Sequence, residues 1–413
     1  MTRPADARPV EIPWEPCRWK TAIYVGKEVE FALVGVVGGV RRLFASEFMQ
    51  RLARKVRGRP RCPDADERDF FAGYLGRWYQ EMGEFFEAAG PTCVSGETVS
   101  RVFEETMELL SDVVLEASGR PVVLACTPTD YKDFASQGAA SPSSTGMHLC
   151  VLSPRALDAQ ELVAFADLLA PLNAVFGPGG LAFSRGVPHW CDDPRARHVK
   201  LVSAGCAYGE SPKPIFLLRN EHFAPTPSYR VQVTGFGNPR SPVVSWIQTD
   251  LVSLALRATL AGKTFPWRSE DPVATLRAEP HAMIRVRRGR PGRATSKRKT
   301  DIAADTVAWL TGDFGEECVE AESIPRIRLL RTLSMRALTA NSEPGEPPVF
   351  PTDISVKKLL FDEVARMHGF DGFHALARAR SDGTSPDHTN KTLEAMIVAD
   401  VLFSSPSREH STY

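Results

Sequence analysis

Apolar and polar residues alternate over residues 21–34, and this alternation predicts a β-strand near the start of the chain. The apolar members occupy odd-numbered positions: Ile23, Val25, Val29, Phe31 and Leu33. Residues 41–57 show instead the wider spacing of an amphipathic helix whose polar side is basic. A strand followed by a helix is therefore expected to open the main part of the chain.

Helical and strand patterns interleave further along, without the regular rhythm of βαβ units. Helical patterns cover 97–117, 158–172 and 241–261. Strand patterns cover 122–126, 148–152, 181–185, 214–219 and 229–234. This order predicts an α+β fold with a mostly antiparallel sheet flanked by helices.

Two compositional changes suggest where the chain is divided. Residues 1–20 are rich in proline and are expected to form an N-terminal tail. Residues 341–352 combine proline, glycine and glutamate, which is typical of a linker. The main domain is then 21–340, and 353–413 is expected to form a small C-terminal helical region.

Composition excludes several classes of protein. The chain has 413 residues, 43% of them apolar and 24% charged, which is typical of a globular protein. Lys+Arg and Asp+Glu both number 50, so a general polyanion-binding protein is disfavoured. No apolar run reaches the roughly 18–20 residues of a membrane span, and the first residues lack the apolar core of a signal peptide. We therefore expect a cytoplasmic protein without a membrane partner.

The eight cysteines are scattered and form no CxxC pair. A structural zinc site needs clustered thiolate or imidazole ligands, so none is predicted. Reduced, packed thiols are expected in a cytoplasmic protein.

Carboxylates on the first strand are the first candidate for chemistry. Glu28 and Glu30 are two residues apart, so their side chains project from the same face of the strand. Two adjacent carboxylates on an apolar strand are unfavourable unless water or a cation neutralises them. Paired oxygen ligands suit Mg²⁺ bound together with phosphates. A solvent-exposed strand face gives the same pattern, and that alternative stays open.

Further polar residues stand at strand positions downstream. Arg77, Tyr79 and Glu81 alternate and could share a face, although a solvated helix face would also place glutamates three apart at 81, 84 and 87. His148 begins a predicted strand. Arg219 ends another, where a guanidinium could clamp phosphate or simply face water.

Taken in order, these segments resemble the Pup ligase and depupylase family of carboxylate-amine ligases, relatives of glutamine synthetase and glutamate–cysteine ligase. Residues 26–31 (GKEVEF) match the family's opening G-x-E-x-E-[FY] strand. Residues 77–93 (RWYQEMGEFFEAAGPTC) align without a gap with its R-x-Y-x-D segment. Residues 146–152 (GMHLCVL), the Gly-rich turn at 176–180 and the strand at 218–223 follow in the family's order. The resemblance covers roughly 21–310.

This chain departs from the family pattern at several positions. The family's catalytic Asp is Glu81 here, and its His-Pro pair is Phe85-Phe86. Leu149-Cys150 replaces the Glu-Asn that follows the family's His, and Gln232 stands where the family has a later His. Part of the shell around metal and substrate is therefore altered.

The resemblance implies a fold, a reaction and a set of site residues. The fold is a curved, mostly antiparallel sheet flanked by helices, and the main domain is the catalytic domain. The reaction uses ATP and Mg²⁺ to activate a carboxylate as an acyl phosphate, which an amine then attacks. The implied metal ligands are Glu28, Glu30, Glu87 and His148. The implied cofactor-binding residues are Arg77, Tyr79, Arg185 and Arg219. The implied catalytic residues are Glu81, as the base, and Arg219.

The partners follow from the same resemblance. The carboxylate would come from an acidic protein modifier or a small glutamyl substrate, and the amine from a protein lysine or a small amine. The interval from Glu28 to Glu81 lacks the long insertion of depupylases, which favours a ligase. A depupylase-like hydrolase using the same site, or a non-catalytic binding homologue, are the alternatives.

A basic run at 285–299 contains no acidic residue. Its glycines and proline predict a hairpin or loop. Three interpretations remain: a solvated loop, a nucleic-acid contact, or a docking surface for an acidic partner. The run lacks interleaved aromatic residues, which disfavours base stacking and hence nucleic acid.

Overall fold

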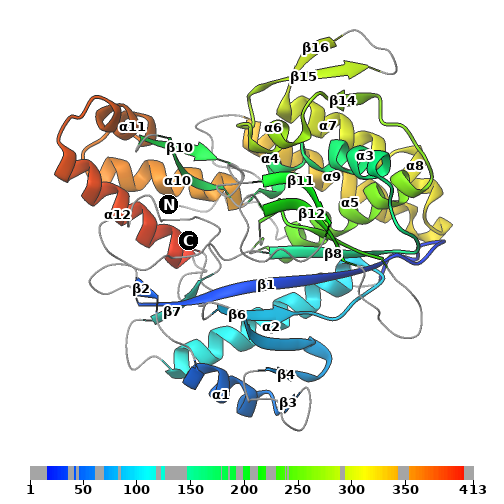
Figure 1. Cartoon of the computed structure of the whole chain (residues 1–413), viewed down its shortest axis with the longest axis horizontal. Coiled ribbons are helices and arrows are strands. Elements are labelled where there is room, and N and C mark those ends of the chain that lie inside the picture. Colours follow the sequence, from blue (N-terminus) through cyan, green and yellow to red (C-terminus); the bar gives the residue numbers. More distant parts are fainter. Residues whose placement is uncertain are drawn as a thin grey trace.

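A central sheet organises the computed structural model of the chain (Figure 1). The structure describes residues 16–35, 41–42, 46–60, 69–81, 85–117, 122–125, 147–177, 179–184, 187–191, 199–204, 213–219, 229–237, 239, 241–288, 294–342 and 353–403. The strand order is β11-β12-β13-β8-β1-β6-β5-β4-β3, with β2 and β7 paired to the far end of β1. Only β11 and β12 pair in parallel, so the predicted mostly antiparallel sheet is confirmed.

The strands of this sheet come from a long stretch of sequence, from Tyr24 to Val233. Their bounds are β1 Tyr24–Gly35, β2 Arg41–Arg42, β3 Arg59–Pro60, β4 Asp69–Phe71, β5 Arg77–Glu81, β6 Phe85–Ala89, β7 Val122–Ala125, β8 Met147–Ser153, β11 Val199–Ala204, β12 Lys213–Arg219 and β13 Tyr229–Val233. β1 is the organising strand, because its first half pairs with β8 along one edge and with β6 along the other.

The two faces of β1 differ, as the alternation in the sequence predicts. Val25, Val29 and Phe31 are fully buried on one face. Glu28 and Glu30 lie on the opposite face and are half-buried. One face of the sheet is therefore a hydrophobic core, and the other presents carboxylates.

Two long helices, α2 (Gly96–Ala117) and α5 (Pro242–Leu260), cover the apolar face. Lys27 marks this packing, since its Nζ donates to Ser245 Oγ of α5 at 3.1 Å and lies 3.7 Å from the ring centroid of Phe103 on α2. Helix α5 begins at a capping residue. Ser241 Oγ accepts a hydrogen bond from the N–H of Val244, and Pro242 occupies the first turn. These helices therefore cover the apolar face of β1, and the carboxylates of Glu28 and Glu30 lie on the opposite face.

Further helices pack around this pair. Their bounds are α1 Ser46–Lys55, α3 Ala159–Leu169, α4 Asn173–Phe176, α6 Pro272–Arg277, α7 Lys299–Leu310, α8 Asp313–Glu317 and α9 Ile324–Ser342, with 3₁₀ turns at Gly73–Leu75 and Ala321–Ser323. The sequence pattern did not predict α7 or α9.

Residues 16–20 were expected to belong to the N-terminal tail, but Trp19 forms a β-bridge with Val319 and so packs against the main domain. Residues 1–15 of that tail lie outside the described residues.

Three C-terminal helices form a second small core with a hairpin from the middle of the chain. The helices are α10 Asp353–Met367, α11 Phe373–Ser381 and α12 Pro386–Phe403, and the hairpin is β9 Gly180–Ser184 and β10 Val187–Cys191. Trp190 of β10 packs edge-on against Phe361 of α10, with ring centroids 6.0 Å apart. The expected linker begins inside the end of α9, and its residues 343–352 lie outside the described part of the chain.

The basic run forms a hairpin, as predicted, and continues into α7. Strands β15 (Met283–Arg288) and β16 (Ala294–Arg298) join β14 (Trp267–Ser269) in a separate three-stranded sheet. Among the described helices, none is both long and apolar enough to span a bilayer.

Candidate metal centre

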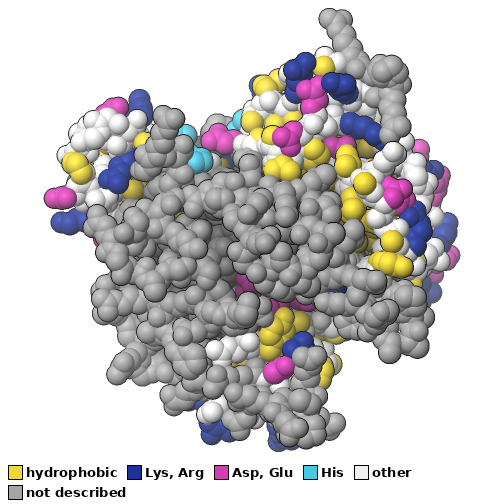
Figure 2. All heavy atoms as spheres, in the orientation of Figure 1, with side chains coloured by type: hydrophobic (Ala, Val, Ile, Leu, Met, Phe, Trp, Pro, Cys, Tyr) yellow, Lys and Arg dark blue, Asp and Glu magenta, His cyan; other side chains and the backbone are white. Residues whose placement is uncertain are grey.

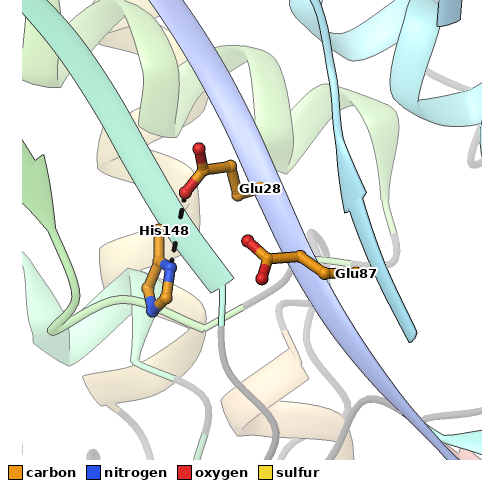
Figure 3. A group of neighbouring side chains, drawn as sticks. All are labelled: Glu28, Glu87 and His148. Atoms are coloured by element: carbon orange, nitrogen blue, oxygen red, sulfur yellow. Dashed lines mark ion pairs between the residues drawn. The ribbon is translucent and has the colours of Figure 1, made fainter. Parts of the chain in front are cut away.

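The pairing of three strands brings the predicted metal ligands together. On β1, Glu28 lies directly opposite His148 of β8, and Glu30 lies directly opposite Glu87 of β6. Residues opposite each other in antiparallel strands share a face, so all four side chains project from the carboxylate face. Figure 3 shows the carboxylates of Glu28 and Glu87 and the imidazole of His148 pointing toward one another.

The spacing of these groups fits a single ion. One ligand atom from each of Glu28, Glu87 and His148 lies within 4.8 Å of the other two. His148 Nδ1 is 3.6 Å from Glu28 Oε2, and its Nε2 is 4.0 Å from Glu30 Oε1. Glu30 therefore lies beside the group formed by Glu28, Glu87 and His148 but is not a member of it.

An orphaned nitrogen supports the fit to a cation. His148 Nδ1 is buried and has no hydrogen-bond partner among the described residues. An imidazole nitrogen with a lone pair is a good metal ligand, and carboxylate oxygens suit Mg²⁺ or Mn²⁺. Glu87 is buried, and its carboxylate lies on the same face as those of Glu28 and Glu30, so a cation beside them would offset their mutual repulsion. The residues present therefore fit a divalent ion.

Strand β13 closes one side of the group. Arg230 donates from Nη2 to Glu28 Oε1, and Gln232 donates from Nε2 to Glu28 Oε2 at 3.1 Å. Arg230 also donates from Nε to Cys150 Sγ at 3.3 Å. Burial, together with the neighbouring Glu28 carboxylate, raises the pKa of the Cys150 thiol well above its usual range, although Arg230 acts in the opposite direction. Cys150 is therefore a neutral thiol that packs beneath the guanidinium.

Strand β5 carries the next group of predicted residues along the sheet. Tyr79 lies opposite Glu87, so it borders the metal ligands. Arg77 is held by Asp69 of β4, with both hydrogen bonds at 2.8 Å, and its guanidinium carbon lies 4.4 Å from the centre of the Tyr79 ring. The carboxylate of Asp69 raises the pKa of Arg77, so this guanidinium stays charged.

The side chains of three predicted site residues, Glu81, Arg219 and Arg185, lie outside the described part of the structure. Glu81 ends β5, two positions beyond Tyr79, and its side chain lies outside the described residues. Glu81 and Glu87 lie on different strands, so the alternative of one solvated helix face is wrong. Arg219 ends β12 opposite Arg230, and only its backbone is described. Arg185 lies outside the described residues.

Sequence reasoning missed Arg230 as a site residue. Its strand reads YRVQV, so Arg230 and Gln232 share a face, and the alternation alone could have paired them. What the sequence could not supply is the register of β13 against β8, which sets Gln232 opposite Cys150.

Comparison with solved structures places this arrangement among known folds. A complex of the prokaryotic ubiquitin-like protein Pup with its ligase PafA aligns with a TM-score of 0.64 at 17% sequence identity, covering 91% of this chain and 81% of that chain. This chain has the fold of the Pup ligase. The Pup ligase PafA in complex with ADP aligns with a TM-score of 0.58 at 16% identity, covering 85% and 81% of the two chains.

A glutamate–cysteine ligase from Francisella tularensis in complex with AMP also aligns, with a TM-score of 0.48 at 11% identity over 93% of this chain and 94% of that chain. No protein-family model and no curated protein sequence matches the chain. The Pup ligase alignments confirm, at the level of fold, the resemblance that the sequence motifs indicated.

Proposed function

We propose that this chain is an ATP- and Mg²⁺-dependent carboxylate-amine ligase of the Pup ligase type. The observation that carries this proposal is the convergence of Glu28, Glu87 and His148 on the face of β1 opposite the hydrophobic core, in a sheet with the Pup ligase fold. A solved Pup ligase with this fold is in complex with ADP, which supports nucleotide binding by this chain.

The proposed reaction has two bond exchanges. A substrate carboxylate oxygen attacks the γ-phosphorus of ATP, the bond to ADP breaks, and an acyl phosphate forms. An amine nitrogen then attacks the acyl carbon, and the bond from that carbon to phosphate breaks. Phosphate is the leaving group, so the carboxylate no longer has to expel oxide.

The residues of the chain divide this work. Glu28, Glu87 and His148, with Glu30 beside them, would hold Mg²⁺, which supplies positive charge against the phosphate oxygens. Tyr79 borders the ligands and would fix the position of Glu87, which lies opposite it. Arg219 and Arg185 are proposed to clamp phosphate, and Arg77 to add positive charge along β5.

Glu81 is proposed as the base for the incoming amine. A lysine amine has a pKa of about 10.4, so near neutral pH one proton must leave before the nitrogen can attack. The position of Glu81 at the end of β5 supports this role, because it is two residues along the same strand from Tyr79.

The donor is proposed to be a glutamyl carboxylate on an acidic protein modifier or on a small molecule, and the acceptor a protein lysine or a small amine. The solved Pup ligase was captured with its protein modifier, which supports the first donor. The basic three-stranded sheet offers such a modifier a docking surface: Arg285 and Arg287 are exposed and share Glu270, with ion-pair distances of 3.1 and 2.9 Å. Figure 2 shows Lys and Arg side chains gathered over β14–β16.

Isotope transfer tests the chemistry directly. The protein is incubated with Mg·ATP, a lysine-containing acceptor peptide, and glutamyl compounds or glutamate-ended acidic peptides labelled with ¹⁸O in the carboxylate. An acyl phosphate transfers one labelled oxygen to the released phosphate, and mass spectrometry detects it. Calorimetry with Mg·ADP provides a measurement that does not require the correct substrate.

The controls separate the alternatives. Glu87→Gln should abolish Mg²⁺-dependent nucleotide binding, whereas the exposed Glu279→Gln should not change it. A wild-type protein that binds no nucleotide with Mg²⁺ would overturn the proposal in favour of a non-catalytic homologue. Isopeptide cleavage without label in the phosphate would point to a hydrolase.

A further inference from the structure

Glu28 is already engaged on both of its oxygens by donors from β13. Arg230 contacts Oε1, and Gln232 contacts Oε2 at 3.1 Å. An ionised carboxylate only accepts hydrogen bonds, so the amide nitrogen of Gln232, and not its oxygen, faces Glu28. The β13 side of Glu28 is thus lined by donors.

The guanidinium of Arg230 cannot serve as a metal ligand. A guanidinium has five N–H donors and no lone pair to offer, and it keeps its charge at any physiological pH. Arg230 is held in place, because its side chain is 8% exposed and its Nε is tied to Cys150 Sγ at 3.3 Å. The guanidinium therefore occupies the position beside Glu28 from which a cation would otherwise neutralise Oε1.

The local charge leaves room for one divalent ion. Among the side chains that the structure describes, three carboxylates face the site, from Glu28, Glu30 and Glu87. Arg230 is paired with the Glu28 carboxylate, and a divalent ion at Glu28, Glu87 and His148 would add two more positive charges to the group. A second divalent ion would give the group a net positive charge and would have to displace the guanidinium from Glu28.

We propose that Arg230 is a built-in cation that occupies the β13 side of Glu28 and excludes a second metal ion there, so that this chain binds one divalent ion, at Glu28, Glu87 and His148. This inference rests on the proposed function, since it assumes that the carboxylate face is a metal site. Arg230 acts through Glu28 and is a positioning residue in this scheme.

Metal stoichiometry tests the proposal without any catalytic assay. Full-length protein is titrated with Mn²⁺ alone, and free Mn²⁺ is measured by electron paramagnetic resonance. The wild type should bind one Mn²⁺ per chain. Arg230→Met removes the charge at similar length and should bind two, whereas Arg230→Lys keeps the charge and should bind one. Circular dichroism melts establish that each variant is folded.

The outcomes distinguish this inference from the proposed function. Two ions in the wild type, or one ion of equal or weaker affinity in Arg230→Met, would overturn the role of Arg230 while leaving a metal site in place. No Mn²⁺ bound to the wild type would overturn both. If Arg230→Met does not fold, Arg230→Gln replaces it, and a second Mn²⁺ bound by that variant but not by the wild type or Arg230→Lys supports the proposal.

Discussion

Glu87→Gln should raise the stability of the metal-free protein and lower the stability of the metal-bound protein. The substitution removes one negative charge and leaves the side-chain volume almost unchanged. Glu87 lies directly opposite Glu30, and its ligand atom is within 4.8 Å of that of Glu28. Two unit charges at that separation repel by about 3.5 kcal/mol at an effective dielectric constant of about 20.

Arg230 offsets part of the repulsion at Glu28, so we expect a net gain of about 1–2 kcal/mol in the free energy of unfolding of the metal-free variant. The melting temperature in EDTA should then rise by about 1–2 °C, because a chain of 413 residues has a large entropy of unfolding. Mn²⁺ affinity should fall at least about 100-fold, because loss of a residue that only supports a ligand already costs about 10–100-fold. Saturating Mn²⁺ should consequently stabilise the wild type far more than the variant.

Scanning calorimetry in EDTA and in Mn²⁺ measures both effects, with the exposed Glu279→Gln as the matched control. The reasoning is refuted if the variant is less stable than the wild type in EDTA and keeps its Mn²⁺ affinity. That result would mean that the contacts of Glu87 within the protein outweigh its repulsion by the neighbouring carboxylates.

Three other perturbations have expected outcomes. Gly96→Ala should lower the free energy of unfolding in urea by about 1–3 kcal/mol. The added Cβ would lie 2.6 Å from Asp250 Oδ1, which accepts a hydrogen bond from the Gly96 N–H. An unchanged free energy of unfolding would contradict this close packing. Burial raises the pKa of Asp167 to about 7. Since this folded-state value lies above the unfolded value of about 3.9, the stability that Asp167 contributes is fully present below about pH 4 and is lost as pH rises through 7. Asp167→Asn should remove this loss, on the order of 4 kcal/mol, and parallel profiles at pH 4–8 would contradict the assignment. Arg77→Met should cost about 1 kcal/mol, since its pair with Asp69 is partly exposed, and the cost should fall when Asp69→Asn is already present.

The period of a β-strand explains why some of the site could be predicted. Glu28 and Glu30 share a face whatever the rest of the fold, because alternation is a local property. His148 and Glu87 became candidates through their order relative to that strand, which the family resemblance supplied. These side chains come within ligand distance of Glu28 only because β6 and β8 pair with β1, and the local sequence pattern does not predict which strands pair.

Arg230 shows the limit of such reasoning. Its pairing with Glu28 spans 202 residues of sequence and depends on β13 lying beside β8 in one register. A shift by one residue would turn Arg230 toward the helices. The helix α9 was missed for another reason: its buried residues Ile327, Leu330 and Leu333 are three apart, but arginines separate them and obscure the pattern.

The distance along the chain between the site residues has a kinetic consequence. Glu28, Glu87, His148 and Arg230 meet only after three non-local strand pairings have formed, and such contacts form late in folding. An ion that binds this group stabilises the native state more than the folding transition state, so it should slow unfolding and leave the refolding rate almost unchanged. Binding of a metal ion at the carboxylate face would then lengthen the lifetime of the folded protein.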